Sequence, residues 1–367
     1  MIRKITVGKN KTWTEEDGAI LSVIIPQYKE DENVIKDLLS SINTQQGINF
    51  RALEVAIVND GSKVILSDEF LKSFTNLDIK YVRLEENKGP GIARQTGIDN
   101  ATGQWIIFAD ADDVFYGTNT FKRFLEDIDD CNSPRSGYFG SNLVIADFLE
   151  VRKDGRLKRV NKDGNWLFAK LIRKSYLDGY NVRFSTELRL YEDTYFIRLM
   201  TAPLLGEDTL EPILYDRTIV YMWRFNRGSL TREGGSSAEY TMNTVDEYVK
   251  SCKLVLDRIK GFKEALLTNI SIYLICSISE SKVIESYCAN ECKDRPFTRM
   301  KEYKTKQLEL SKYICNTYPK EVEELINNRT DIIENHVDEV NSAHIFPIVD
   351  SVDCIRHVRS ILNGNIR

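Results

Sequence analysis

The stretch WIIFADADD, residues 105–113, decides how the fold of this chain is interpreted. Five of its first six residues are apolar or aromatic, which predicts a buried β-strand. Three carboxylates follow within four residues: Asp110, Asp112 and Asp113. Because like charges repel each other and an unpaired buried carboxylate is costly, we expect a positive charge at the end of this strand.

This strand is the last of four predicted strands that alternate with helices. The other strands are expected at residues 21–26, 53–60 and 79–87, and the helices at residues 31–45, 67–74 and 89–101. The alternation predicts an α/β fold, a mostly parallel sheet with helices on both faces. Ligands of such sheets bind beyond the carboxyl ends of the strands, where the three carboxylates lie.

The pattern changes after residue 140. Asp154-Gly155 separates two alternating runs, which predicts a β-hairpin. Residues 168–179 and 191–202 look helical, and residues 212–226 look like a closing strand. The hairpin carries the densest basic cluster of the chain: Arg152, Lys153, Arg156, Lys158 and Arg159. Such a cluster fits a solvated hairpin face, and it also fits a surface for an anionic acceptor.

A Gly/Ser-rich stretch, TREGGSSAE at residues 231–239, predicts a linker. Helical periodicity follows it at residues 245–259, 265–288, 297–318, 321–326 and 348–362. We therefore expect an α/β domain over residues 1–235, with residues 1–19 as an N-terminal extension, and an all-α domain over residues 236–367. The tail is expected to serve assembly, as a possible homo-oligomer, or acceptor presentation.

Composition is that of an ordinary soluble globular protein, with 367 residues, 42% hydrophobic residues and a net charge of −5. This charge gives no general support to a nucleic-acid or membrane-surface binder. The N-terminus lacks an apolar leader, and the most apolar segment, residues 265–278, is short for a membrane span, so a cytoplasmic location is expected. The seven cysteines are then expected to be free thiols. Cys288 and Cys292 lack a second pair with zinc-site spacing.

Carboxylates at a strand end can converge on one cation. Oxygen ligands suit Mg²⁺ or Mn²⁺, and these ions usually share their coordination shell with substrate phosphates. The cluster therefore predicts a divalent metal that carries a diphosphate. A short acidic cluster also occurs in solvent or at helix starts, and Asp113 could cap a following helix.

Four motifs in order raise the weight of the metal interpretation: SVIIPQYKEDENV (22–34), VAIVNDGS (55–62), NKGPGIARQTGIDNATGQWIIFADADD (87–113) and YEDTYFIRLM (191–200). Together they resemble the inverting family 2 glycosyltransferases over roughly residues 20–232. The resemblance implies the Rossmann-like GT-A fold, a UDP-sugar donor, a hydroxyl acceptor and a divalent cation. The helical tail lies outside it.

The resemblance also implies a role for each matching residue. Asp112 would be the direct metal ligand, and Asp110 would bind the ribose or a metal-bound water, with Asp113 as a supporting carboxylate. Asp60 would accept the N–H of uracil, although an Asp-Gly turn explains it as well. The nucleotide-sugar site would comprise Pro26, Gln27, Tyr28, Glu30, Asp60, Gly89, Arg94, Asp110, Ala111 and Arg224.

The proposed reaction needs a general base, because the acceptor hydroxyl loses a proton as it attacks the anomeric carbon. In YEDTYF the resemblance assigns this role to Asp193 and makes Glu192 its support. A single attack inverts the configuration, so an α-linked donor would give a β-linked product. Alternatively, both carboxylates complement the N-terminus of a helix.

The chain departs from many relatives because it has no histidine in the α/β region to act as a further metal ligand; His336, His344 and His357 all lie in the tail. The corresponding region, YMWRFNRGSLTR, offers Trp223, Arg224, Ser229 and Thr231 instead. Arg224 could contact the diphosphate or pair with a surface acid. Trp166, Phe168 and Trp223 could form an acceptor platform or belong to the core.

Two other function classes stay open at this point. A nucleotidyltransferase would also place carboxylates and metal at a strand end, but the loop PQYKEDE after the first strand is acidic where a basic, Gly-rich loop is wanted. A non-catalytic nucleotide-sugar-binding or scaffold protein would keep the fold without the chemistry. The presence of Asp112 and Asp193 argues against the scaffold.

Overall fold

The computed structural model describes residues 5–7, 11–13, 19–205, 213–226, 240, 242–291, 298–342 and 350–365. The chain forms two compact units. The first comprises Met1–Met200 and Leu210–Arg227, and the second comprises Thr201–Thr209 and Gly228–Arg367. The expected linker at residues 231–239 and the domain boundary at residue 235 lie outside the described residues, as do Ser229 and Thr231.

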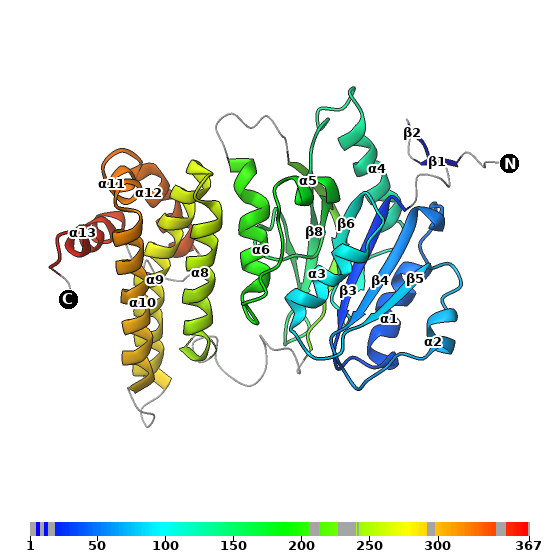
Figure 1. Cartoon of the computed structure of the whole chain (residues 1–367), viewed down its shortest axis with the longest axis horizontal. Coiled ribbons are helices and arrows are strands. Elements are labelled where there is room, and N and C mark those ends of the chain that lie inside the picture. Colours follow the sequence, from blue (N-terminus) through cyan, green and yellow to red (C-terminus); the bar gives the residue numbers. More distant parts are fainter. Residues whose placement is uncertain are drawn as a thin grey trace. The chain divides into compact units, whose positions relative to one another are not determined.

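The four predicted strands form the parallel half of the main sheet, in the order β5-β4-β3-β6. Their bounds are β3 Leu21–Gln27, β4 Leu53–Asn59, β5 Ile79–Arg83 and β6 Trp105–Phe108. The helices between them are α1 Glu32–Asn43, α2 Asp68–Lys72 and α3 Pro90–Asn100, so the predicted alternation is confirmed (Figure 1). A 3-10 turn at Phe50–Ala52 precedes β4, and a separate antiparallel pair joins β1 Ile5–Val7 to β2 Lys11–Trp13.

Helices cover both faces of this parallel half. Val23 and Ile25 of β3 share a buried cluster with Ile35 of α1. Ile24 points the other way, because successive side chains of a strand alternate between faces. A Cβ atom on Gly97 of α3 would lie 2.4 Å from Cγ2 of Ile24, so α3 packs closely on that face because Gly97 has no side chain.

The second half of the sheet adds antiparallel strands, so the sheet as a whole is mixed. β10 (Lys170–Arg173) lies antiparallel between β6 and β8 (Leu143–Val151). β11 (Leu214–Trp223) runs parallel to β8, and β7 (Val114–Phe115) pairs antiparallel with β11. β9 (Leu157–Val160) pairs antiparallel with β8, which confirms the predicted hairpin.

Three further helices belong to the first unit: α4 Thr120–Asn132, α5 Lys174–Gly179 and α6 Glu192–Thr201. The expectation of a helix at residues 168–179 is therefore wrong in its first half, where β10 forms. Its four residues pair with two strands from other parts of the chain. This long-range pairing overrides the local helical pattern.

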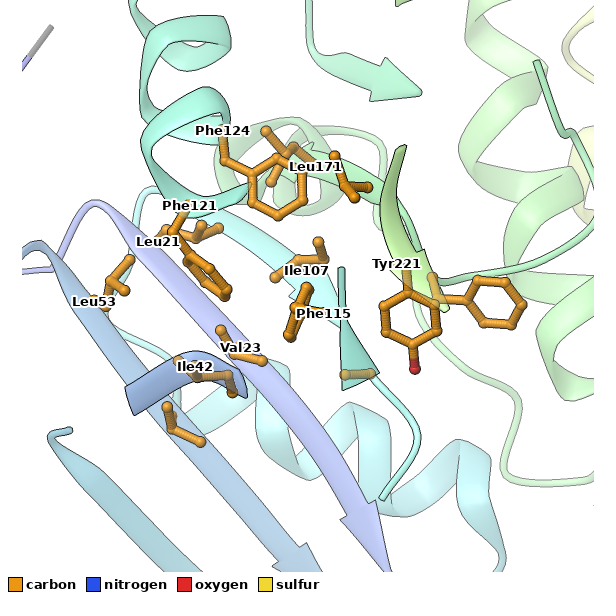
Figure 2. Close-up of a cluster of buried hydrophobic side chains, with 14 of the residues drawn as sticks. Leu21, Val23, Ile42, Leu53, Ile107, Phe115, Phe121, Phe124, Leu171 and Tyr221 are labelled. Carbon is orange, nitrogen blue, oxygen red and sulfur yellow. The ribbon is translucent and has the colours of Figure 1, made fainter. Parts of the chain in front are cut away.

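Aromatic side chains fill the centre of the first unit (Figure 2). Phe115 contacts Phe121 and Tyr221 edge to face, with ring centroids 4.8 and 5.4 Å apart. Phe124 joins them from α4. Such edge-to-face pairs are each worth about 0.5–1.5 kcal/mol beyond the burial of their area. The cluster therefore fixes α4, β7 and β11 in the positions from which β11 reaches the candidate site.

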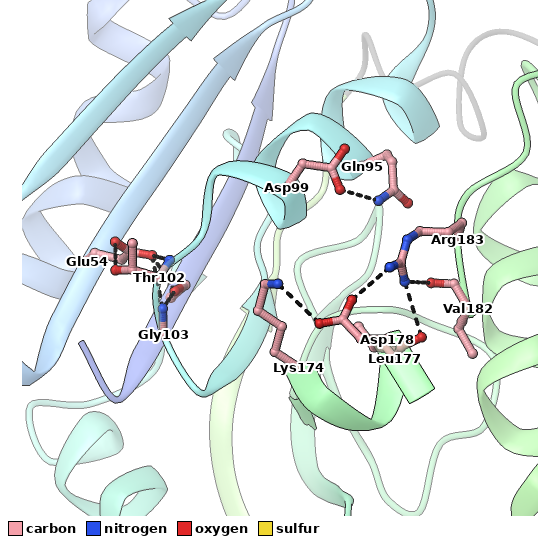
Figure 3. Close-up of polar contacts among 11 residues, drawn as sticks. Glu54, Gln95, Asp99, Thr102, Gly103, Lys174, Leu177, Asp178, Val182 and Arg183 are labelled. Atoms are coloured by element: carbon pink, nitrogen blue, oxygen red, sulfur yellow. Dashed lines mark hydrogen bonds and ion pairs between the residues drawn. The ribbon is translucent and has the colours of Figure 1, made fainter. Parts of the chain in front are cut away.

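A buried carboxylate ties together the amino ends of the strands. Glu54 accepts hydrogen bonds from Ser22 Oγ, Thr102 Oγ1 and Lys80 Nζ at 2.5, 2.6 and 2.8 Å. Thr102 and Gly103, in the loop before β6, lie directly against it (Figure 3). Burial opposes ionisation of Glu54, but these hydrogen bonds lower its pKa to about 2. The network holds the loop from α3 to β6, and with it the start of WIIFADADD.

The second unit is helical, which confirms the fold class expected for the tail. A 3-10 turn at Ala202–Leu205 contacts α9. The helices are α8 Val245–Ile259, α9 Lys263–Glu291, α10 Thr298–Thr317, α11 Pro319–Asn328, α12 Thr330–Ser342 and α13 Ser351–Leu362. Within the described residues, no helix combines the length and the apolar character that a membrane span requires.

The cysteines whose side chains the structure describes are free, as expected: Cys131, Cys252, Cys276, Cys315 and Cys354. The side chain of Cys288 and the whole of Cys292 and His344 lie outside the described part. His336 contacts Ser271 Oγ through Nδ1 at 3.0 Å within the helical unit.

Candidate active site

A guanidinium stands at the end of the strand WIIF. Arg94 of α3 is 8% exposed. Its Nη2 lies 2.9 Å from Oδ1 of Asp110, the carboxylate that follows β6. Its Nη1 lies 3.0 Å from Oε1 of Glu192, the first residue of α6. The positive charge that the acidic cluster requires is thus supplied in part by the protein itself, and it links the third and fourth sequence motifs.

Small residues make this bridge possible. Gly89, with φ of 93°, and Pro90 begin α3. A Cβ atom on Gly91 would lie 2.9 Å from Cγ of Glu192, so the missing side chain lets Glu192 approach the first turn of α3. Arg94 follows one turn later, on the side that faces the two carboxylates.

The contacts of Arg94 with Asp110 and Glu192 come with shifts in the pKa values of Glu192 and Arg94. Burial and the adjacent Asp193 raise the pKa of Glu192 to about 7, although Arg94 opposes this. Burial disfavours the charge of Arg94, but Asp110 and Glu192 outweigh it and raise the pKa of Arg94 above its usual value. Arg94 therefore stays charged, and Glu192 titrates near neutrality.

Asp113 has a different role from a helix cap. It is fully buried, and it accepts hydrogen bonds from the Tyr221 hydroxyl at 2.9 Å and from the Arg224 backbone N–H at 2.7 Å. The Tyr221 oxygen also accepts from the backbone N–H of Asp110 at 2.9 Å. Burial and the neighbouring Asp110 and Asp112 raise the pKa of Asp113 well above its usual value. Asp113 and Tyr221 thus attach the end of β11 to the carboxylate segment.

Asp112 is held by residues that follow β11. Asn226 Nδ2 donates to Asp112 Oδ2 at 2.9 Å, and Arg224 Nε donates to the backbone oxygen of Asp112 at 2.6 Å. Arg224 also forms an ion pair with Asp37 of α1 at 2.7 Å, which supports the interpretation that it pairs with a surface acid. Burial and Asp110 raise the pKa of Asp112, and the Asn226 hydrogen bond opposes this.

The second motif forms a turn that holds the start of α3. The two carboxylate oxygens of Asp60 accept the backbone N–H groups of Lys88 and Gly89, each at 2.8 Å. Burial raises the pKa of Asp60, while these bonds oppose the rise. Gly61 has φ of 64°, and a Cβ atom there would lie 2.1 Å from the Glu86 carbonyl carbon. The Asp-Gly turn is therefore real, and it brings Asp60 to the carboxyl edge of the sheet.

The first motif supplies an exposed ring beside this turn. Gln27 is buried and donates to the backbone oxygens of Glu30 and Val64 at 2.8 and 3.2 Å. Glu30 accepts from the backbone N–H of Tyr28 at 2.8 Å. Tyr28 as a residue is 39% exposed, so its ring is accessible for stacking. Pro26 lies within β3, where it pairs with Val58.

The three aromatic residues predicted for the acceptor lie together but differ in exposure. Phe168 is 4% exposed and stacks on Tyr221 with centroids 4.8 Å apart, so it is a core residue. Trp166 and Trp223 are half-buried, and their centroids are 4.5 Å apart. Asp193, also half-buried, lies in the first turn of α6 and accepts the Thr194 N–H at 2.6 Å.

The carboxylates of the site bear on whether it could hold a divalent cation. Among the described residues, no three His, Cys, Asp or Glu side chains are grouped so that they could hold a metal by themselves. Arg94 takes Oδ1 of Asp110, and Asn226 takes Oδ2 of Asp112. A divalent cation at this edge would therefore have to complete its shell with oxygens from elsewhere, such as substrate phosphates.

Sequence reasoning missed three residues of this site: Asp37, Tyr221 and Asn226. Tyr221 and Asn226 hydrogen-bond to residues more than 100 positions earlier in the chain. Tyr221 sits at an apolar position of a strand, and no local pattern separates it from a core residue. The WRFN segment that ends with Asn226 is the one signal that could have indicated it.

Comparison with known proteins gives one family match. Residues 22–147 match the family described as "Glycosyl transferase family 2". Glycosyltransferase GlyA of Streptococcus pneumoniae is 29% identical over 227 residues, which are 58% of this chain and 31% of GlyA. The poly(ribitol-phosphate) β-N-acetylglucosaminyltransferase TarS of Staphylococcus aureus is 28% identical over 181 residues, 48% of this chain and 31% of TarS. The matched segments span less than a third of either relative.

Among solved structures, residues 1–349 of S. aureus TarS in complex with UDP resemble this chain with a TM-score of 0.55. The identity is 17%, and the match covers 94% of this chain and 91% of that one. The same TarS segment in complex with UDP-GlcNAc has a TM-score of 0.52. At this identity the likeness shows the fold, which is GT-A followed by helices.

Proposed function

Because residues 22–147 match the model of glycosyl transferase family 2, we propose that this chain is a metal-dependent, inverting glycosyltransferase that uses a UDP-sugar. One observation carries the proposal. Arg94 holds Asp110, at the end of β6, and Glu192, beside Asp193, with one guanidinium. One side chain therefore bridges the carboxylate expected near the donor and the carboxylates expected near the acceptor.

The donor end of the site is proposed at the turn after β4 and the loop after β3. Asp60 holds the start of α3, and its carboxylate can accept a further hydrogen bond from the uracil N–H because each oxygen has two lone pairs. Tyr28 presents an exposed ring for stacking on the base. The UDP and UDP-GlcNAc complexes of TarS support the choice of a uridine nucleotide.

Asp112 and Asp110 would hold a divalent cation. When bound, such an ion neutralises the charge that develops on the departing UDP. Asn226 orients Asp112, and Arg94 orients Asp110, so the free carboxylate oxygens are positioned before the donor arrives.

Asp193 is proposed to remove the proton from the acceptor hydroxyl. It is half-buried in the first turn of α6, next to Glu192, whose side chain is fixed by Arg94. Arg94 therefore positions the first turn of α6 relative to the donor carboxylates. With one base and one attack on the face opposite UDP, the product has inverted anomeric configuration.

The experiment that tests this function is isothermal titration of the full chain with UDP, with and without Mn²⁺, followed by a hydrolysis screen over UDP-sugars. We expect UDP to bind more tightly with Mn²⁺, and one UDP-sugar to be hydrolysed faster than the others. A chain that binds no uridine nucleotide under either condition would contradict the proposal. Binding of UDP without hydrolysis of any donor would favour the non-catalytic alternative.

A further inference from the structure

The hairpin of β8 and β9 carries five basic side chains, here called the basic hairpin: Arg152, Lys153, Arg156, Lys158 and Arg159. All five are exposed. The chain as a whole has a net charge of −5, so this concentration of positive charge is a local departure from its average. The proposed chemistry of the carboxylates makes no use of it.

Strand register places the basic hairpin beside the candidate site. Trp223 of β11 pairs with Glu150 of β8, and Glu150 pairs with Lys158 of β9. On the other side of β11, Met222 pairs with Val114, so Asp113 lies next to Trp223. Neighbouring strands are about 4.8 Å apart, so three steps separate the backbone of Lys158 from that of Asp113 by roughly 15 Å.

The turn of the basic hairpin also lies at the same edge of the sheet as the candidate site. β8 runs parallel to β6, because β10 is antiparallel to both. Its carboxyl end at Val151 therefore lies at the same edge of the sheet as Asp60 and Asp110. Ligands that cross this edge from the carboxylates toward β9 meet the basic hairpin.

Direct contacts with acidic side chains neutralise only part of the positive charge of the basic hairpin. Arg156 pairs with Asp154, and Arg159 pairs with Asp147, each at 2.6 Å. The side chains of Arg152, Lys153 and Lys158 form no hydrogen bond or ion pair with the part of the chain that the structure describes.

Two half-buried tryptophans lie between the two charged regions. Trp223 occupies the row between Asp113 and Glu150, and it packs against the half-buried Trp166. A molecule that extends from the carboxylate segment toward β9 would meet these two rings first and the cations next. That order fits a chain of sugar or polyol units that carries anionic groups.

We propose that the basic hairpin binds anionic groups of the acceptor, so that the acceptor of this enzyme is a polyanionic glycan or polyol polymer. The proposal rests on the proposed function, which makes the molecule crossing this edge an acceptor. Guanidinium and ammonium groups bind both phosphates and carboxylates, so either can supply the negative charge. The hairpin recognises the repeating charge of the polymer at a distance from the reacting hydroxyl.

The test compares three full-length proteins: wild type, the triple variant Arg152→Gln, Lys153→Gln, Lys158→Gln, and a matched control. The control is Lys72→Gln, Lys122→Gln, Arg135→Gln, which removes the same charge from exposed positions of the same unit. Fluorescence anisotropy at low salt measures binding of labelled inorganic polyphosphate and labelled polygalacturonate. Short duplex DNA and phosphatidylglycerol vesicles serve as competing partner classes, and UDP titration serves as the measure of the donor site.

We expect wild type to bind one of the two polyanions and the triple variant to bind it at least about 10-fold more weakly, with UDP binding unchanged. The preferred polyanion identifies phosphate or carboxylate as the recognised group. Equal weakening in the control, no binding of either polyanion, or tighter binding of DNA or vesicles would overturn the proposal. If the triple variant loses polyanion binding but the wild-type chain does not bind UDP, the proposed function is overturned instead. The assignment of the polyanion as an acceptor would then fail with it.

Discussion

At the scale of single residues, Arg94 sets the electrostatics of the candidate site. One buried guanidinium contacts two carboxylates that are separated by 82 positions, Asp110 and Glu192. Removing one partner of such a buried pair typically costs 3–5 kcal/mol, because the other charge stays buried and uncompensated. Arg94 was expected in the nucleotide-sugar site, and the structure gives it two carboxylate partners that this expectation did not include.

The metal assignment is tested at Asp112. We predict that Asp112→Ala abolishes the Mn²⁺-dependent part of UDP binding, because it removes a carboxylate oxygen proposed to hold the ion. The fold should persist, because Asp112 lies in a turn after β6 and not inside a strand. Isothermal titration with and without Mn²⁺ measures the effect, with Asp68→Ala on the exposed face of α2 as control. An unchanged Mn²⁺ dependence in Asp112→Ala would show that the assignment is wrong.

The general base is tested at Asp193. Asp193→Asn keeps the shape of the side chain and removes its basicity, so we predict a fall in transfer rate on the order of 10²-fold or more. Donor binding should stay nearly unchanged. Rates with saturating donor and a titration with UDP separate the two effects, and Asp68→Asn is the control. A loss of UDP affinity as large as the loss of rate would place Asp193 in the nucleotide site.

At the scale of elements, α4 and β11 share a buried acidic pair that lies outside the candidate site. Arg123 of α4 contacts Asp127 at 2.8 Å and Asp216 of β11 at 2.9 Å. Burial and the nearby Asp216 raise the pKa of Asp127 to about 8. Burial would also raise the pKa of Asp216, but hydrogen bonds from Arg123 and Thr218 lower it below its usual value. Asp127 is therefore protonated in the folded protein at pH values where it is ionised in the unfolded chain.

This difference predicts a pH-dependent stability. Because the pKa of Asp127 is raised in the folded state, Asp127 makes its full contribution to folding stability below the unfolded pKa of 3.8. This contribution disappears as pH rises toward 8. We predict that the wild-type free energy of unfolding, compared with that of Asp127→Asn, falls over this window by at most about 1.4 kcal/mol per pH unit. Denaturant melts at several pH values measure it, and Asp130→Asn, exposed on the same helix, should behave like wild type. A constant difference between wild type and Asp127→Asn would contradict the prediction.

At the scale of the whole molecule, the residues of the proposed chemistry all belong to the unit of Met1–Met200 and Leu210–Arg227. The helical unit includes the turn at Ala202–Leu205, whose Ala202 and Pro203 are buried. The role proposed for the helical unit is assembly or acceptor presentation, not chemistry. Loss of the helices should nevertheless lower thermal stability, because this turn contacts α9.

We predict that a chain ending at residue 236 keeps UDP binding and donor hydrolysis below its melting temperature. It should lose transfer to the natural acceptor or its native oligomeric state. Circular dichroism establishes that the shortened chain is folded, and light scattering compares the oligomeric states. A folded shortened chain that binds no UDP would show that the helical unit completes the active site.

Local patterns in the sequence were enough to predict the main elements of this fold and the order of its motifs. Apolar runs and helical spacing are properties of neighbouring residues, so β3, β4, β5 and β6, the hairpin at Asp154-Gly155 and the helical tail were predictable. Because parallel strands end at one edge of a sheet, the order of the motifs also predicted that Asp60 and Asp110 follow strands at the same edge.

Tertiary structure alone decided which side chains meet at that edge. β10 became a strand because β6 and β8 flank it, and local periodicity carries no information about such partners. Tyr221 and Asn226 reached Asp113 and Asp112 because β11 folds back beside β7. The same long-range packing brought Glu192 to Arg94. These contacts depend on how the elements pack against one another, so no pattern within a single segment could reveal them.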